Sequence, residues 1–163
     1  MNNDITSEER LLILLTLASP TGEEKKGIQT LSSRNLSWKK LYSLAEENAT
    51  VPLVQQNLEK HELFEAIPPN IRILFQEKSD RVRRANEERL QAAKKLFAKF
   101  EEKQVPVVIL KGVLFAETIY ANSYYKKMND VDILIRQEDL NTVYDIYEEL
   151  DYFSMGELLG DHR

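Results

Sequence analysis

Cysteine is absent from this 163-residue chain, and histidine occurs only twice, at His61 and His162. A disulfide scaffold is therefore excluded, and so is any zinc or redox site that depends on thiolates. A metal centre built from several histidines is nearly excluded as well. The hydrophobic share of 42% still allows a chain of this length to bury a sizeable core.

Long apolar runs are also missing. The longest near the start is Leu11–Leu15, extended by three further residues, which is too short to cross a bilayer. The residues before it, 2–9, are acidic, whereas a secretory signal begins with basic residues. We therefore expect a cytoplasmic protein without a membrane partner.

Basic residues are scarce in the last third of the chain. The formal net charge is −5; residues 1–104 carry 17 Lys and Arg against 16 Asp and Glu, whereas residues 105–163 carry 5 against 11. An acidic surface repels the phosphates of nucleic acids. Binding of DNA or RNA by residues 105–163 alone is therefore disfavoured.

The first hundred residues predict helices with breaks near Pro20 and Pro68. Thr6 and Glu9 have the spacing of a capping box ahead of the first apolar run, and Ser37 is a typical N-cap. Further helices are expected over about residues 23–32, 38–48 and 53–61.

From Ile71 to about Lys103 the chain has neither proline nor glycine, and apolar residues recur at helical spacing. A continuous helix here would be about 50 Å long at 1.5 Å per residue; a break near Lys78–Arg81 is the alternative. Its polar face carries six basic residues interleaved with acids: Arg81, Arg83, Arg84, Arg89, Lys94 and Lys95. This alternation favours a solvated, salt-bridged face over a basic groove for a polyanion.

The pattern changes at Val105. Two short apolar runs, Val107–Leu110 and Val131–Ile135, predict strands, and each is followed by a segment of helical spacing, Val113–Tyr120 and Glu138–Asp151. The chain is therefore expected to be α+β, with a helical leader over residues 1–104 and a strand-helix-strand-helix region over residues 105–163.

Asp130 and Asp132 are the strongest candidates for chemistry. In an extended segment, residues two apart point the same way, so the two carboxylates would lie side by side. Such a pair repels unless a cation offsets it, and magnesium commonly takes one or two carboxylates together with substrate phosphates. A solvated polar turn ahead of a strand is the alternative.

Lys111 and Gly112 lie where the first strand would turn into a helix. A glycine there lets backbone amides approach a phosphate, and a lysine adds a point charge. Lys126 precedes the aspartates and could offset their repulsion or reach a phosphate, whereas Lys127 is interpreted as a solvated loop residue. An ordinary strand-to-helix turn is the alternative for the Lys-Gly pair.

At these residues the chain resembles a bacterial family described as uncharacterised nucleotidyltransferases, within the DNA polymerase beta-like nucleotidyltransferase superfamily. The resemblance rests on three stretches: Trp38-x-x-Leu41-x-x-Leu44-Ala45 followed by Pro52-Leu53, then Val105–Tyr120, then Lys126–Leu140. It implies that Asp130 and Asp132 ligate Mg²⁺, that Lys111 and Gly112 line the triphosphate site, and that residues 105–163 begin a nucleotidyltransferase-type α/β core.

The chain departs from that family in three ways. Lys126 stands where an arginine is usual, which keeps the charge but loses the bidentate fork. The turn supplies one glycine and no hydroxyl. A third carboxylate from a later strand is not recognisable between Leu150 and Arg163. We therefore expect a chain truncated at its C-terminus, with an incomplete core and weak or absent catalysis.

The expected function is a magnesium-dependent nucleotidyltransferase, which moves a nucleoside monophosphate from a nucleotide triphosphate to an acceptor hydroxyl. The acceptor is left open between a small molecule, a peptide and an RNA end. The alternative is a degenerate, non-catalytic module that acts through protein-protein contact, with a protein partner or as a homodimer.

Overall fold

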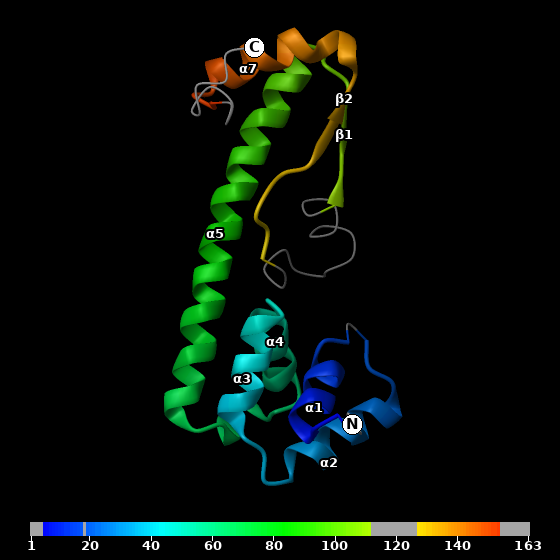
Figure 1. Cartoon of the computed structure of the whole chain (residues 1–163), viewed down its shortest axis with the longest axis vertical. Helices are drawn as coiled ribbons and strands as arrows, with labels where there is room; N and C mark the ends of the chain where they lie inside the picture. The colour runs from blue at the N-terminus through cyan, green and yellow to red at the C-terminus, as the bar shows by residue number, and fades with distance from the viewer. Residues whose placement is uncertain (1–4, 18, 112–126, 154–163) are drawn as a thin grey trace. The chain divides into compact units, whose positions relative to one another are not determined.

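The computed structural model describes residues 5–17, 19–111 and 127–153 of the chain (Figure 1). Within these residues the structure is α+β: mostly helical, with one two-stranded sheet. The described residues divide into two compact units. One contains residues 5–86, and the other contains residues 87–111 and 128–153. No helix in the described part of the chain combines the length and apolar character needed to cross a membrane.

The first unit consists of helices packed on one core. Its elements are α1 (Ser7–Leu15), α2 (Gly22–Ser32), α3 (Trp38–Glu47), α4 (Val51–Lys60), the short 3-10 helix η1 (Phe64–Ala66) and the beginning of α5 (Pro69–Glu102). Leu11, Leu15, Ile28, Leu41 and Phe75 are fully buried in this core. The helices expected from apolar periodicity are therefore confirmed.

Local capping explains where these helices begin. The Thr6 backbone N–H donates to Glu9 Oε2 at 2.7 Å, and the Glu9 N–H donates back to Thr6 Oγ1 at 3.3 Å, which confirms the predicted capping box. Thr21 and Glu24 form a second box at α2. The Ser37 hydroxyl accepts from the Lys40 N–H at 3.2 Å, as predicted for an N-cap.

Four helices end in the same way, on a left-handed residue that is not glycine. These residues are Ala49, Glu62, Gln104 and Asp151, with φ between 55° and 59°. At each, the next residue's N–H reaches back to the carbonyl five residues earlier, as from Thr50 to Ala45. This is the Schellman arrangement, in which glycine is preferred because a Cβ is strained at positive φ.

The long helix α5 is unbroken over its 34 residues, so the alternative break near Lys78–Arg81 does not occur. The absence of proline and glycine between Ile71 and Lys103 accounts for this continuity. The last third of α5, with Leu96 and Phe100, belongs to the core of the second unit.

The second unit packs an antiparallel ribbon and a helix against the end of α5. Strand β1 (Val107–Ile109) pairs with β2 (Ile133–Ile135), and Val108 lies directly opposite Leu134. The 3-10 helix η2 (Gln137–Asp139) and α7 (Leu140–Glu149) follow. The core contains Leu96, Phe100, Val105, Val143 and Ile146. The second strand begins two residues later than expected, and the helix expected over Val113–Tyr120 lies outside the described residues.

A cluster of charges joins the end of α5 to the end of α7. Glu149 accepts from Lys103 Nζ at 2.9 Å and from Lys99 Nζ at 3.1 Å. These lysines, Lys103 most, hold the pKa of Glu149 below its usual 4.5. Lys103 and Glu149 are solvent-exposed and Lys99 is partly exposed. The ion pairs therefore orient the two helices without adding much stability, and salt weakens them.

We predict that Ala49→Gly stabilises the first unit by about 0.5–1 kcal/mol, because it removes the left-handed strain at φ 55°. The matched control is Glu47→Gly, in the last turn of α3, where glycine costs about 1 kcal/mol. Urea unfolding measures both; a loss of stability in Ala49→Gly would contradict the assignment.

We predict that stability declines as the pH drops below about 6.5, through His61. Its Nε2 is buried and has no hydrogen-bond partner among the described residues. Burial, followed by nearby Lys60 and Lys25, lowers the pKa of His61 below 6.5. The unfolded chain therefore takes up the proton first, so this stability is fully present above about pH 6.5 and is lost as the pH falls.

The measurement is Tm between about pH 7.5 and 5.5. The comparison is between His162→Gln and the double variant His61→Gln/His162→Gln, so that His61 is the only histidine that differs. The fall of Tm with decreasing pH should be smaller in the double variant. An equal fall of Tm in both variants would show that His61 does not cause the pH dependence.

Candidate functional site

The candidate site lies at the open end of the ribbon, where Lys111 meets the Asp-Val-Asp motif. The Leu110 N–H donates to the Asp132 carbonyl at 2.9 Å, which extends the β1–β2 pairing one residue beyond both strands. This register places Lys111 beside the aspartate segment, although 21 positions of sequence (132 − 111) separate Lys111 from Asp132.

Lys111 and Asp132 form an ion pair, with Nζ and Oδ2 3.5 Å apart. Lys111 has φ 43°, a left-handed conformation that is uncommon outside glycine and asparagine. The backbone thus leaves the strand direction at Lys111, directly ahead of Gly112. Residues held in such conformations cluster at functional sites, and this one presents its ammonium to Asp132.

The ribbon has an inner face towards the core and an outer face towards solvent. Val107, Ile133 and Ile135 are half-buried against the core and Ile109 is half-buried on the same face, whereas Val108 and Leu134 are 55% and 59% exposed. Asp132 is two residues from Leu134 and opposite Leu110, so it belongs to the outer face. A cation or phosphate can therefore reach it from solvent.

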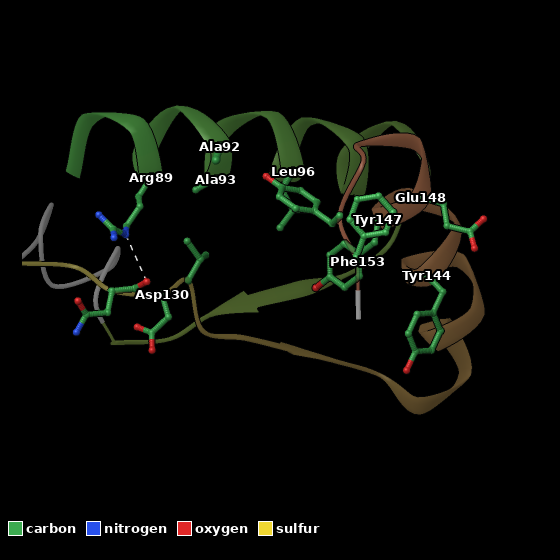
Figure 2. Close-up of a pocket in the computed structure, with 12 residues that line it drawn as sticks. Arg89, Ala92, Ala93, Leu96, Asp130, Tyr144, Tyr147, Glu148 and Phe153 are labelled. Carbon is green, nitrogen blue, oxygen red and sulfur yellow. Dashed lines mark hydrogen bonds between the residues drawn. The ribbon is translucent and has the colours of Figure 1, made fainter. Parts of the chain in front are cut away.

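Asp130 lies further along the same segment and is exposed. In Figure 2 its carboxylate turns away from α5, while Arg89 reaches from α5 towards the same segment. Arg89 Nε donates to the Asn129 carbonyl at 3.3 Å, and this bond ties the segment to the helix. The aspartates therefore stand on a backbone that is anchored on both sides.

The structure brings together some of the predicted site residues. Lys111 and Asp132 are in contact and Asp130 is two residues away; Gly112 and Lys126 lie outside the described residues. Within the described ranges, no group of three histidine, aspartate or glutamate side chains is gathered as around a metal ion. The described donor set is thus a pair of carboxylates, which suffices for magnesium only when phosphates complete its shell.

A pocket of about 430 Å³ lies on the inner side of the same segment, within the second unit (Figure 2). Sequence reasoning missed this pocket and placed Arg89 on a solvated face. The signal that could have found it is spacing: Arg89, Ala93 and Leu96 recur at i, i+4 and i+7, which is one side of a helix.

The structure is thus an α+β protein in which Lys111 and Asp132 are in contact at the end of the ribbon, with Asp130 two residues away. The chain belongs to the family described as uncharacterised nucleotidyltransferase, which matches residues 34–163. This membership supports a general nucleotidyltransferase activity. No curated protein and no solved structure matches the chain.

We predict that Asp132→Asn changes the free energy of unfolding by less than about 1 kcal/mol, because its ion pair with Lys111 is solvent-exposed. Phe100→Ala, in the core of the same unit, should cost about 3–5 kcal/mol. Urea unfolding compares the two. A large loss in Asp132→Asn would assign the aspartate a structural role.

Proposed function

We propose that the chain is a magnesium-dependent nucleotidyltransferase, which transfers a nucleoside monophosphate from a nucleotide triphosphate to an acceptor hydroxyl. Asp130 and Asp132 hold the metal, and Lys111, with Gly112 and Lys126, contacts the triphosphate. The observation that carries the proposal is the ion pair between Lys111 and Asp132, which joins the two motifs at one end of the ribbon.

The chemistry of the donors supports magnesium. Hard carboxylate oxygens are its preferred ligands, and two of them leave positions for waters and for phosphate oxygens. Both aspartates are within reach of solvent, and Lys111 Nζ lies 3.5 Å from Asp132 Oδ2. Bound Mg²⁺ would supply charge neutralisation for the triphosphate and polarise its α-phosphoryl group.

The residues of the chain then act by position and charge. Lys111 can exchange its contact with Asp132 for a phosphate oxygen, since both are anionic and the ammonium is on a flexible stem. The acceptor oxygen forms a bond to the α-phosphorus, the bond between that phosphorus and the α,β-bridging oxygen breaks, and pyrophosphate leaves. The hydroxyl proton passes to water. The nucleotide is a nucleoside triphosphate of unassigned base.

The acceptor is a small molecule, a peptide or an RNA end. Of these, an RNA end is least favoured, because residues 105–163 carry 5 basic against 11 acidic side chains.

A second candidate is a non-catalytic module that acts through protein contact. The outer face of the ribbon favours it, because Val108 and Leu134 form an exposed cross-strand apolar pair with Leu110 beside them. In that case a partner protein, or a second copy of the chain, would cover this face and the aspartates would have no metal to hold.

We predict that Asp130→Asn combined with Asp132→Asn abolishes magnesium-dependent nucleotide binding without unfolding the protein. Loss of supporting groups around a metal costs roughly 10–100-fold in affinity, and loss of the ligands themselves should cost at least as much. Calorimetric titration with each nucleoside triphosphate, with and without magnesium, measures the effect.

The matched control is Asp145→Asn combined with Asp151→Asn, which removes the same charge from exposed positions of the same unit. It should bind as the unmodified chain does. Equal nucleotide affinity in the two double variants would reject the metal site and leave the protein-contact candidate, which a Val108→Ser/Leu134→Ser variant would then test by its effect on oligomeric state.

A further inference from the structure

The pocket behind the aspartate segment has the size of a small-molecule site. Its volume of about 430 Å³ lies within the roughly 300–1,000 Å³ that such sites span. It is bounded by α5, by residues 129–131, by α7 and by the two residues 152–153, all of which belong to the second unit.

The lining divides into an apolar floor, an aromatic wall and a polar end. Ala92, Ala93 and Leu96 of α5 make the floor, and the methyl side chains of the two alanines leave the space open (Figure 2). The wall consists of aromatic residues: Tyr144, Tyr147, Tyr152 and Phe153. Arg89 stands at the polar end, and Asn129, whose carbonyl accepts from Arg89, also lines the pocket.

Two side chains of the aromatic wall pack on each other, and two others are exposed to solvent. Tyr147 and Tyr152 meet edge to face, with ring centroids 5.9 Å apart and planes at 84°. Phe153 nevertheless remains 75% exposed and Tyr144 51%. Large apolar side chains gathered around a cavity and left open to water are typical of a ligand site.

This pocket adjoins the proposed metal site and shares Asp130 with it. Asp130 and Val131 line the pocket, whereas Asp132 belongs to the outer face and does not line it. A molecule in the pocket therefore touches Asp130 and the backbone that leads to Asp132.

We propose that this pocket binds a small, neutral, aromatic molecule with one or two hydrogen-bonding groups. Binding of this molecule changes the conformation of residues 129–132. An effect of this conformational change on nucleotide binding rests on the proposed function. Binding of the aromatic molecule to the pocket does not rest on that function.

The charges and shape of the lining select this class of ligand. One basic side chain, Arg89, is offset by the acidic Asp130 and Glu148, so the lining offers no net attraction for an anion. The floor and the edge-to-face tyrosines suit a flat ring, and the tyrosine hydroxyls and the Asn129 amide offer hydrogen bonds.

The test uses 2-naphthol as the probe, with 2-naphthoate as its anionic counterpart, in the absence of magnesium and nucleotide. Saturation-transfer NMR should show saturable binding of 2-naphthol, in the millimolar range expected for about eleven non-hydrogen atoms. Ala92→Leu fills the pocket and should weaken binding at least about tenfold. Ala98→Leu, the same change on an exposed position of α5 that does not line the pocket, should leave it unchanged.

When the same titration is followed by amide chemical shifts, the amide signals of Asn129–Asp132 and Tyr147 should shift. The amide signal of Ile28, in the first unit, should not shift. Three results would overturn the proposal: no saturable binding at about 5 mM probe, equal affinity in Ala92→Leu, or tighter binding of 2-naphthoate. Failure of magnesium-dependent nucleotide binding would reject the proposed function alone, because none of these readouts uses a nucleotide.

Discussion

The pairing register of two short strands is the constraint on which the candidate site depends. Val107 lies opposite Ile135 and Ile109 opposite Ile133, and this face of the ribbon packs on α5 and α7. A slip of one residue would exchange the two faces, because side chains alternate along a strand. The same register sets Lys111 beside Asp132. Burial of the isoleucines thus positions charges that contribute little to stability themselves.

This separation of roles is physically sensible. An exposed ion pair such as that of Lys111 and Asp132 is worth little, so it can open for a phosphate or a metal at low cost. The supporting backbone is held elsewhere: by the bond from Leu110 to the Asp132 carbonyl and by the bond from Arg89 to the Asn129 carbonyl. A site that must exchange partners benefits from a firm backbone and weakly held side chains.

Features with local causes were predictable from the sequence. The capping box of Thr6 and Glu9 and the Ser37 cap join groups three residues apart, and the continuity of α5 follows from a run without proline or glycine. The first residue of the second strand was not predictable in this way, because β2 begins where its pairing with β1 begins and not where the apolar run begins. The contacts of Arg89 with Asn129 and of Lys111 with Asp132 join residues 40 and 21 positions apart (129 − 89 and 132 − 111), which no local pattern specifies.

The amino-acid sequence by itself determined the helices, the two apolar strands and the family to which the chain belongs, because these depend on residue spacing and on short motifs. It also supplied the paired aspartates and the lysine as candidates. Only the tertiary structure decided which ribbon face carries Asp132, which charge stands beside it, and that a pocket lies behind it. The reason is that burial of Ile133 and Ile135 against α5 and α7 is a property of the packed unit, and every one of those placements follows from that packing.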